Sequence, residues 1–396
     1  MPNIIIIGFG NVSKEFISKL VNKFNPIRLL IITRINSINS RRIIESLGYI
    51  KERIMVLTKY SGYIRRKNIV VELIGDNLYS KDILLRTLSN NCTLVTANKN
   101  LLYKNINIIG RFLNKSIFFE ASIGGGVQIL DTLYFLKKVA RIRSIYSILN
   151  GTTNYILSNI KKCNFSVKDV INLSKKKGIS ENDPVKDIKG YDSLNKITVL
   201  SNLVIRIDNN ENIKSINMFG IEHINKLTIT FLYLNRVHIR LISTFIRKKG
   251  VFNIETAPCI LEIRDILSFN NFVYNTFVIS TNTYGKFTLK ARGAGPKVTS
   301  ISVLRNVIKN KRVNIKNKEV SRNKYISGIR KTKILIVSSI SIFTKNFNIA
   351  SKVGIKYKLT YFKNKLIILI SSKNCIFRIR KLFSLIGNVF PFFRLA

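Results

Sequence analysis

Short runs of β-branched and other apolar residues alternate with amphipathic segments along the first 150 residues of the chain. The predicted strands cover residues 3–7, 27–32, 69–74, 93–96, 118–122 and 145–149. Helical spacing follows the first run through Leu20, begins again near Ser80, and begins once more near Leu130. Strands that alternate with helices in this way form a parallel sheet covered on both faces, so the pattern predicts a doubly wound α/β fold.

The first predicted strand runs directly into the glycine-containing stretch GFGNVS at residues 8–13. Gly8 permits a tight turn, and Gly10 lets the backbone approach a pyrophosphate bound by the N–H groups that open the next helix. Ser13 stands where the dinucleotide-binding pattern has its third glycine, so we expect helix and strand to lie slightly further apart. The stretch is a candidate dinucleotide-binding turn.

Two basic residues follow predicted strands of this sheet. The second strand ends in Thr33-Arg34, where an NAD-specific protein usually places a carboxylate to bind the ribose hydroxyls. Arg34 suits a 2′-phosphate instead, which favours NADP(H) over NAD(H). Lys99 follows strand 93–96 and would stand at the edge where doubly wound sheets bind ligands, although an ordinary surface lysine is the alternative.

Two polar or glycine-rich turns follow later strands. Residues 123–127 contain three successive glycines, which indicate close backbone approach to either a cofactor or a cation held by carbonyl groups. Residues 150–154 read NGTTN, a turn that serves either as a polar substrate cradle or as a well-capped helix start.

Residues 181–196 hold four of the chain's twenty carboxylates, although the chain carries 67 lysines and arginines. Apolar spacing from Leu194 onward predicts a helix, with Asp192 at or near its N-terminus. Asp192 and Lys196 are then one turn apart on one face, where they could act as an acid/base pair. The alternative is a solvated surface ion pair, which contributes only about 0.3–0.5 kcal/mol.

Composition narrows the class of protein. The formal charge of +47 is spread over the whole length among isoleucines and asparagines, which suggests A/T-rich codon usage rather than a nucleic-acid face. Four separated cysteines suggest neither a zinc site nor a disulfide framework. Because the chain has no long uncharged apolar window and no leader-like N-terminus, we expect a cytoplasmic protein with no nucleic-acid or membrane partner.

Six motifs together resemble homoserine dehydrogenase in order and approximate spacing. They are GFGNV at 8–12, TANKNLL at 96–102, EASIGGG at 120–126, LNGTTNYIL at 149–157, GISENDPVKDIKGYDSLNK at 178–196 and RGAG at 292–295. The resemblance covers roughly residues 1–310. It implies reduction of L-aspartate 4-semialdehyde to L-homoserine with NAD(P)H, in threonine and methionine biosynthesis, by a homodimer or homotetramer.

The resemblance also implies an organisation into domains. A Rossmann-type doubly wound nucleotide-binding domain would span residues 1–128 and be completed by about 293–320. An α+β substrate-binding and dimerisation domain with an antiparallel sheet, including a strand at 272–280, would span 129–292. Residues 321–396 would form a degenerate, shortened ACT-like segment.

Residue roles are carried over from the family motif by motif. Lys196 would be the proton donor, Asp192 would position the reacting end of the substrate, and Lys99 would lie where nicotinamide and substrate meet. The substrate-binding residues would be Glu181, Gly178, Asn150, Gly151 and Thr152. The cofactor-binding residues would be Gly8, Phe9, Gly10, Asn11, Val12, Arg34, Gly75, Ala97, Lys99, Gly293 and Gly295. A structural Na⁺ or K⁺ would be held by Glu120 and by the carbonyls of Ile123, Gly125 and Val127.

The last 75 residues carry strand-like runs at 333–340, 355–362, 366–371 and 389–394 and a helical stretch at 376–385. An ACT domain holds its amino-acid effector at an Asp-x-Pro-Gly-type turn, which this segment lacks, and no acidic residue follows Glu319. An eroded dehydrogenase with a basic, RNA- or polyanion-binding C-terminal segment is the alternative function. The family residues that favour the enzyme are all retained: Lys99, Glu181, Asp192 and Lys196.

Overall fold

The computed structural model describes most of the chain and divides it into two compact units. The described residues are 4–23, 29–32, 54–57, 62–65, 68–75, 78–112, 116–160, 167–177, 179–180, 183–205, 213–224, 226–234, 237–248, 251–269, 273–310, 332–338, 356–362, 365–372 and 393–394. The first unit comprises residues 1–141, 198–210 and 289–322, and the second comprises 142–197, 211–288 and 323–396.

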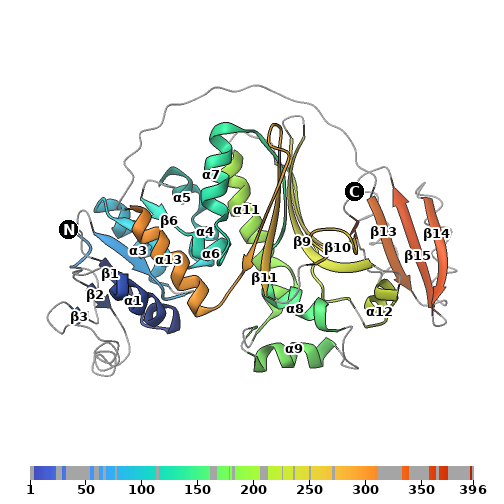
Figure 1. The fold of residues 1–396 in the computed structure, drawn as a ribbon, viewed down its shortest axis with the longest axis horizontal. Helices are drawn as coiled ribbons and strands as arrows, with labels where there is room; N and C mark the ends of the chain where they lie inside the picture. The colour runs from blue at the N-terminus through green and yellow to red at the C-terminus, as the bar shows by residue number, and fades with distance from the viewer. Residues whose placement is uncertain are drawn as a thin grey trace. The chain divides into compact units, whose positions relative to one another are not determined.

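A parallel sheet forms the centre of the first unit (Figure 1). Its strands are β1 (Ile4–Ile7), β2 (Leu29–Ile32), β3 (Ile54–Leu57), β4 (Ile69–Glu72), β5 (Thr93–Thr96) and β6 (Ile117–Phe118). They lie in the order β3-β2-β1-β4-β5-β6, and each neighbouring pair is parallel. The order reverses between β1 and β4, the switch point where doubly wound sheets bind their ligands. The predicted doubly wound fold is confirmed.

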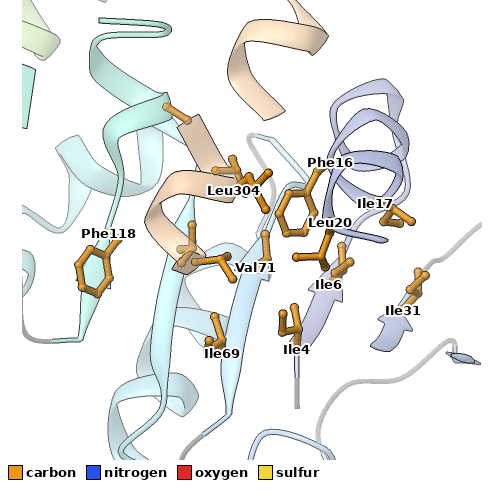
Figure 2. Close-up of a cluster of buried hydrophobic side chains, with 14 residues drawn as sticks. Ile4, Ile6, Phe16, Ile17, Leu20, Ile31, Ile69, Val71, Phe118 and Leu304 are labelled. Atoms are coloured by element: carbon orange, nitrogen blue, oxygen red, sulfur yellow. The ribbon is translucent and has the colours of Figure 1, made fainter. Parts of the chain in front are cut away.

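Helices pack on this sheet through a continuous apolar cluster (Figure 2). The helices of the unit are α1 (Asn11–Lys23), α3 (Ser80–Ser89), α4 (Lys99–Lys104), α5 (Ile106–Phe112), α6 (Glu120–Ile123), α7 (Ile129–Val139) and α13 (Pro296–Asn310). Alternate strand residues such as Ile4 and Ile6 meet Phe16 of α1 and Leu304 of α13 in the cluster. The late helix α13 lies beside α1 (Figure 1), so a distant part of the sequence completes the first core.

The second unit is built on a largely antiparallel sheet. Its strands are β7 (Ile142–Ile148), β8 (Ile213–Met218), β9 (Val237–Lys248), β10 (Val251–Glu262), β11 (Tyr274–Thr281), β12 (Lys286–Arg292), β13 (Thr332–Ser338), β14 (Lys356–Phe362), β15 (Lys365–Ser372) and β16 (Phe393–Arg394). The order is β12-β11-β7-β9-β10-β16-β13-β15-β14, and β8 pairs with β10. The long β9 and β10 pair along their full length, so they form the backbone of the sheet.

Helices of the second unit pack on this sheet. They are α8 (Gly151–Asn159), α9 (Val167–Lys176), α10 (Val185–Ile188), α11 (Tyr191–Ile205) and α12 (Lys226–Leu234). Residues of α8, α9 and α12 share one apolar cluster with β9. Apolar residues of α8, including Tyr155 and Ile156, pack against Ile239 and Leu241 of β9. This packing fixes α8, whose first turn carries the NGTTN motif.

Some element predictions were wrong or incomplete. The strand predicted at 118–122 ends at Phe118, because Glu120 opens α6 and the Gly124 N–H donates to the Glu120 carbonyl at 3.1 Å. The strand β3 was not predicted. The runs predicted at 333–340, 355–362 and 366–371 correspond to β13, β14 and β15. The run predicted at 389–394 is described only at residues 393–394, which form β16, and the helix predicted at 376–385 lies outside the described residues.

Among the described residues, none of the helices is long and apolar enough to cross a membrane.

Candidate active site

The end of β7, the helix α10 and the start of α11 bring two carboxylates, an amide and a lysine together in the second unit. Asp192 lies in the first turn of α11, and Lys196 follows one turn later. The Lys196 Nζ atom donates to Asp192 Oδ2 at 2.7 Å and to the Leu149 carbonyl at 2.8 Å. Lys196 is buried, with 6% of its side chain exposed, and Asp192 is partly buried, with 14% exposed. The solvated surface pair considered from sequence is therefore excluded.

Asn150 holds the two carboxylates of this site. Its Nδ2 atom donates to Asp187 Oδ1 at 2.7 Å and to Asp192 Oδ2 at 2.9 Å. Its Oδ1 atom accepts from the Thr153 backbone N–H at 2.8 Å, which makes Asn150 the N-cap of α8. Because the N–H fixes the oxygen side of the amide, the nitrogen side must face the carboxylates. We name Asn150, Asp187, Asp192 and Lys196 the carboxylate clamp.

Asn150 bears on both alternatives for the NGTTN turn. The turn is a capped helix start, and the same capping residue reaches into a polar site. Gly151 opens α8, and Thr152 beside it is buried. Asp187 was not predicted as a site residue, although it lies in the acidic run. Only the contact with Asn150, 37 residues away, marks it as part of the site.

A sharp turn before α11 aims its first residues into the clamp. Gly190 has φ +86°, a conformation that favours glycine, and its N–H donates to the Asp187 carbonyl at 3.0 Å. The Leu194 N–H then donates to the Gly190 carbonyl at 2.9 Å as the helix begins. The glycine thus lets Asp187, before the turn, and Asp192, after it, meet the same amide. With two carboxylates and one ammonium, the clamp carries a net charge of −1 when all three are ionised.

The predicted dinucleotide-binding turn is formed in the first unit. Gly8 has φ +104°, and a Cβ there would come within 2.7 Å of the Leu73 carbonyl oxygen, so only glycine fits. Gly10 is exposed and α1 begins at Asn11. Ser13 is fully buried and its hydroxyl donates to the Gly8 carbonyl at 2.7 Å. The serine therefore ties the helix to the turn with a hydrogen bond where the fingerprint glycine would give close packing.

Lys99 opens α4 at the carboxyl edge of the same sheet. The N-cap of this helix is Asn98, whose Oδ1 accepts from the Leu101 N–H at 3.0 Å. Gly75, with φ +71°, follows the neighbouring strand β4. A buried carboxylate that no motif pointed to, Glu72, lies at the end of β4 and bonds to the Thr96 hydroxyl. The edge thus carries both the predicted lysine and an unpredicted acid.

Glu120 lies in a buried position near the N-terminus of α7. The side chain is 2% exposed and accepts from the Leu130 N–H at 2.9 Å and the Asp131 N–H at 3.4 Å. Arg305 Nη1 lies 4.0 Å from Glu120 Oε2, and Arg305 also pairs with Asp131. Burial raises the pKa of the Glu120 carboxyl to about 7. The carboxylate therefore lies where further positive charge would stabilise it.

The successive glycines at 124–126 contact the chain itself. A Cβ at Gly125 would lie 2.1 Å from the Gly293 carbonyl oxygen, and the Gly126 N–H donates to the Arg292 carbonyl at 2.9 Å. The Gly125 carbonyl accepts from the Ser302 hydroxyl. The close backbone approach predicted from sequence is thus made by the loop that leads into α13.

Three predicted site residues, Arg34, Gly178 and Glu181, lie outside the described residues. In the part of the chain that the structure describes, there is no group of three or more His, Cys, Asp or Glu side chains that could hold a metal ion. The described cysteines, Cys92 and Cys259, are buried free thiols.

Comparison with known proteins identifies the family of this chain. The family model described as homoserine dehydrogenase matches residues 129–308. The homoserine dehydrogenase of Methanocaldococcus jannaschii is 31% identical over 250 residues, which cover 61% of this chain and 72% of the relative. That of Neisseria gonorrhoeae is 26% identical over 319 residues, covering 77% and 71%.

Solved structures show the same fold. The structure of a homoserine dehydrogenase from Thiobacillus denitrificans has a TM-score of 0.83 at 19% identity and covers 100% of this chain and 98% of that one. A hyperthermophilic archaeal homoserine dehydrogenase in complex with NADPH has a TM-score of 0.63 at 23% identity, covering 78% and 97%. Together with the sequence identity and coverage shared with the Methanocaldococcus protein, these findings show that the chain belongs to the homoserine dehydrogenase family.

Proposed function

We propose that the carboxylate clamp carries the homoserine dehydrogenase reaction, with Lys196 as the proton donor and Asp192 as the residue that positions the reacting end of the substrate. One observation supports this most: Lys196 is buried and its ammonium is aimed by two hydrogen bonds of 2.7 and 2.8 Å. Hydride transfer to the aldehyde carbon of L-aspartate 4-semialdehyde leaves an alkoxide, which needs a proton and nearby positive charge. A fixed ammonium supplies both.

The remaining clamp residues and their neighbours would bind the amino-acid part of the substrate. The net charge of −1 on the clamp suits a substrate ammonium, because opposite charges attract strongly where water is excluded. Asn150, Gly151 and Thr152 stand at the start of α8 beside these carboxylates. Glu181 with Gly178 would bind the substrate amino group, as the family resemblance implies, and Asp187 joins them as an addition drawn from the structure.

The dinucleotide turn of the first unit would bind the nicotinamide cofactor. Residues 8–12 would approach the pyrophosphate through backbone N–H groups at the start of α1. Gly75, Ala97 and Lys99 stand at the carboxyl edge of the sheet, and Lys99 would face the nicotinamide. Gly293 and Gly295 lie in the loop before α13, where Gly295 has φ +119°. The cofactor accepts or gives the hydride, and these residues orient it.

NADPH is the cofactor we propose to be preferred, with Arg34 contacting the 2′-phosphate. The archaeal neighbour that was solved with NADPH supports the choice. A charge-assisted contact of this kind contributes about 1.5–3 kcal/mol, or roughly ten- to hundredfold in kcat/KM. Arg34→Ala should remove most of the preference. Because general positive charge on the protein could also favour NADPH, a preference unchanged in Arg34→Ala would exclude this residue.

The cation site carried over from the family also fits the charges of the described residues. Glu120, with the carbonyls of Ile123, Gly125 and Val127, would hold Na⁺ or K⁺, because a carboxylate whose pKa burial raises to about 7 gains from a nearby cation. Glu120→Gln provides the test. A higher melting temperature in KCl or NaCl than in tetramethylammonium chloride of equal ionic strength, absent in Glu120→Gln, is expected, and equal melting temperatures would exclude the site.

The larger organisation is proposed from the same resemblance. Residues 1–128 with about 293–320 would bind the nucleotide, residues 129–292 would bind substrate and form a homodimer or homotetramer, and residues 321–396 would be a shortened ACT-like cap in a cytoplasmic enzyme. Light scattering during size-exclusion chromatography would test the assembly. Nucleic-acid association should be weak and non-saturating in a salt titration, since the positive charge is dispersed.

A matched pair of variants tests the site assignment. Asp192→Asn should lose activity with L-aspartate 4-semialdehyde, because it misplaces the substrate and Lys196 together. Asp183→Asn changes an exposed carboxylate of the same acidic run and should keep wild-type activity. Equal activity of the two variants would show that the clamp does not carry the reaction.

A further inference from the structure

The geometry at the carboxyl ends of β4 and β5 points to Glu72 as a positioning residue that acts through Thr96 and Asn98 to place Lys99. We infer that the buried Glu72 carboxylate fixes the backbone that leads into α4. The inference rests on the proposed role of Lys99, which begins that helix.

Glu72 occupies a position where a buried parallel strand would ordinarily carry an apolar residue. β4 reads IVVE, lies between β1 and β5, and is fully buried at Glu72. Glu72 pairs with Ile7 on one side and with Thr96 on the other. Ile69 and Val71 join the apolar cluster, so Glu72 points to the opposite face of the sheet. Burying an isolated carboxylate raises the free energy of the folded state, so Glu72 needs hydrogen-bond donors around it.

Neutral donors surround both carboxylate oxygens. Oε2 accepts from the Thr96 hydroxyl, while Oε1 accepts from the Ile74 N–H at 3.2 Å and lies 3.5 Å from Asn98 Nδ2. These bonds lower the pKa of Glu72, but desolvation outweighs them and the pKa lies above its ordinary value. The position of the carboxylate thus depends on these hydrogen bonds, and the loss of any donor would change it.

The network continues from Glu72 to the residue before Lys99. The Thr96 hydroxyl, which donates to Glu72, accepts from the Asn98 N–H at 2.9 Å. The Asn98 side chain donates to the Gly75 carbonyl and to Ser80 Oγ at 3.1 Å, and it caps α4 through Leu101. Both the backbone and the side chain of Asn98 are therefore fixed. The backbone direction at Lys99, the next residue, is fixed as a consequence.

An amide cannot replace this carboxylate. The Ile74 N–H is a fixed donor, so the amide oxygen of Glu72→Gln must face it. The amide nitrogen would then donate to the Thr96 hydroxyl, which already accepts from Asn98. The hydroxyl proton of Thr96 loses its acceptor, and the Glu72-Thr96-Asn98 relay is broken although the side-chain volume is unchanged.

The test combines conservative variants with a double-mutant cycle on the full-length enzyme. Glu72→Gln and Thr96→Val should each lower kcat tenfold or more, with little change in the KM for L-aspartate 4-semialdehyde and in the dissociation constant for NADPH. Thr96→Ser, which keeps the hydroxyl, should stay within about threefold of wild type. In a Lys99→Ala background, Glu72→Gln should change kcat by less than twofold.

Three results would overturn the inference. One is a wild-type kcat in Glu72→Gln and Thr96→Val. Another is an equal factor of kcat lost on Glu72→Gln in the presence and absence of Lys99, which would indicate a purely structural effect. The melting temperature of each variant is the second readout. The third is a wild-type kcat in Lys99→Ala alone, which would show that Lys99 has no role in catalysis. Because Glu72 is intact in that variant, this result would contradict the proposed function of Lys99 and can be told apart from a failure of the Glu72 network.

Discussion

Asn150 performs two roles that different substitutions can separate. Its Oδ1 atom caps α8, and its Nδ2 atom bridges Asp187 and Asp192. Asn150→Ser keeps a side-chain oxygen that can cap the helix but removes the bridging donor, whereas Asn150→Ala removes both. Serine and asparagine are about equally good N-caps, so the two variants should differ in stability and not in catalysis.

The structure sets the size of the catalytic effect. The bridging distances of 2.7 and 2.9 Å limit the separation of the two carboxylate oxygens to their sum, 5.6 Å. At an effective dielectric constant of about 20, two unit charges at that distance repel by about 3 kcal/mol, and each charge-assisted hydrogen bond offsets about 1.5–3 kcal/mol. Without the bridge, we expect Asp192 and Lys196 to lose about 2–3 kcal/mol of transition-state stabilisation, or about 30- to 150-fold in kcat/KM.

NADPH oxidation with L-aspartate 4-semialdehyde measures the catalytic effect, and urea unfolding measures the stability effect. Both variants should lose about 30- to 150-fold in kcat/KM and the stability that the bridge contributes, and Asn150→Ala should lose about 1 kcal/mol more unfolding free energy than Asn150→Ser because it also loses the cap. An Asn150→Ser enzyme within threefold of wild type would refute the bridging role. Equal destabilisation of the two variants would refute the capping role.

Three further predictions follow from the same structure. Gly8→Ala should abolish NADPH binding in a fluorescence titration, because its Cβ would meet the Leu73 carbonyl at 2.7 Å. The pKa of Glu120 rises on folding from 4.5 to about 7, a difference of 2.5, so this carboxyl favours the folded state when protonated below about pH 4.5. In tetramethylammonium buffer, where the proposed Na⁺ or K⁺ is absent, that contribution, up to about 3 kcal/mol, is lost as the pH rises through 7 and should be missing in unfolding of Glu120→Gln. Threonine should not inhibit at sub-millimolar concentration, because no Asp or Glu side chain follows Glu319 to bind its ammonium. Inhibition removed by truncation near residue 325 would contradict this.

Local patterns predicted much of the first unit. The β-branched run at 93–96 and the glycine turn at Gly8 carry their structural signal in adjacent residues, and both were found as predicted. The end of β6 was misplaced because Phe118 and Phe119 extend the apolar run. Glu120 begins a helix there, and its side chain accepts hydrogen bonds from Leu130 and Asp131, contacts that the apolar run does not reveal.

The site residues were harder to predict than the strands, because they are identified by contacts between distant parts of the chain that no local sequence pattern contains. Asp192 and Lys196 could be paired from their spacing, but their burial could not be predicted. Asp187 enters the clamp only through Asn150, and Glu72 reads as the end of an ordinary strand until Thr96 is placed beside it. These polar groups are held by partners from other elements, so sequence periodicity alone does not identify them.

The proton-donor role of Lys196 is the central claim, and one comparison tests it most directly. Lys196→Ala should lower kcat by about 10²- to 10⁴-fold, the usual contribution of a positioned general acid, while the dissociation constant for NADPH stays within about twofold. Lys186→Ala, an exposed lysine in the same motif, should match wild type. If Lys196→Ala keeps most of its kcat, the buried ion pair with Asp192 is structural and the proposed mechanism is wrong.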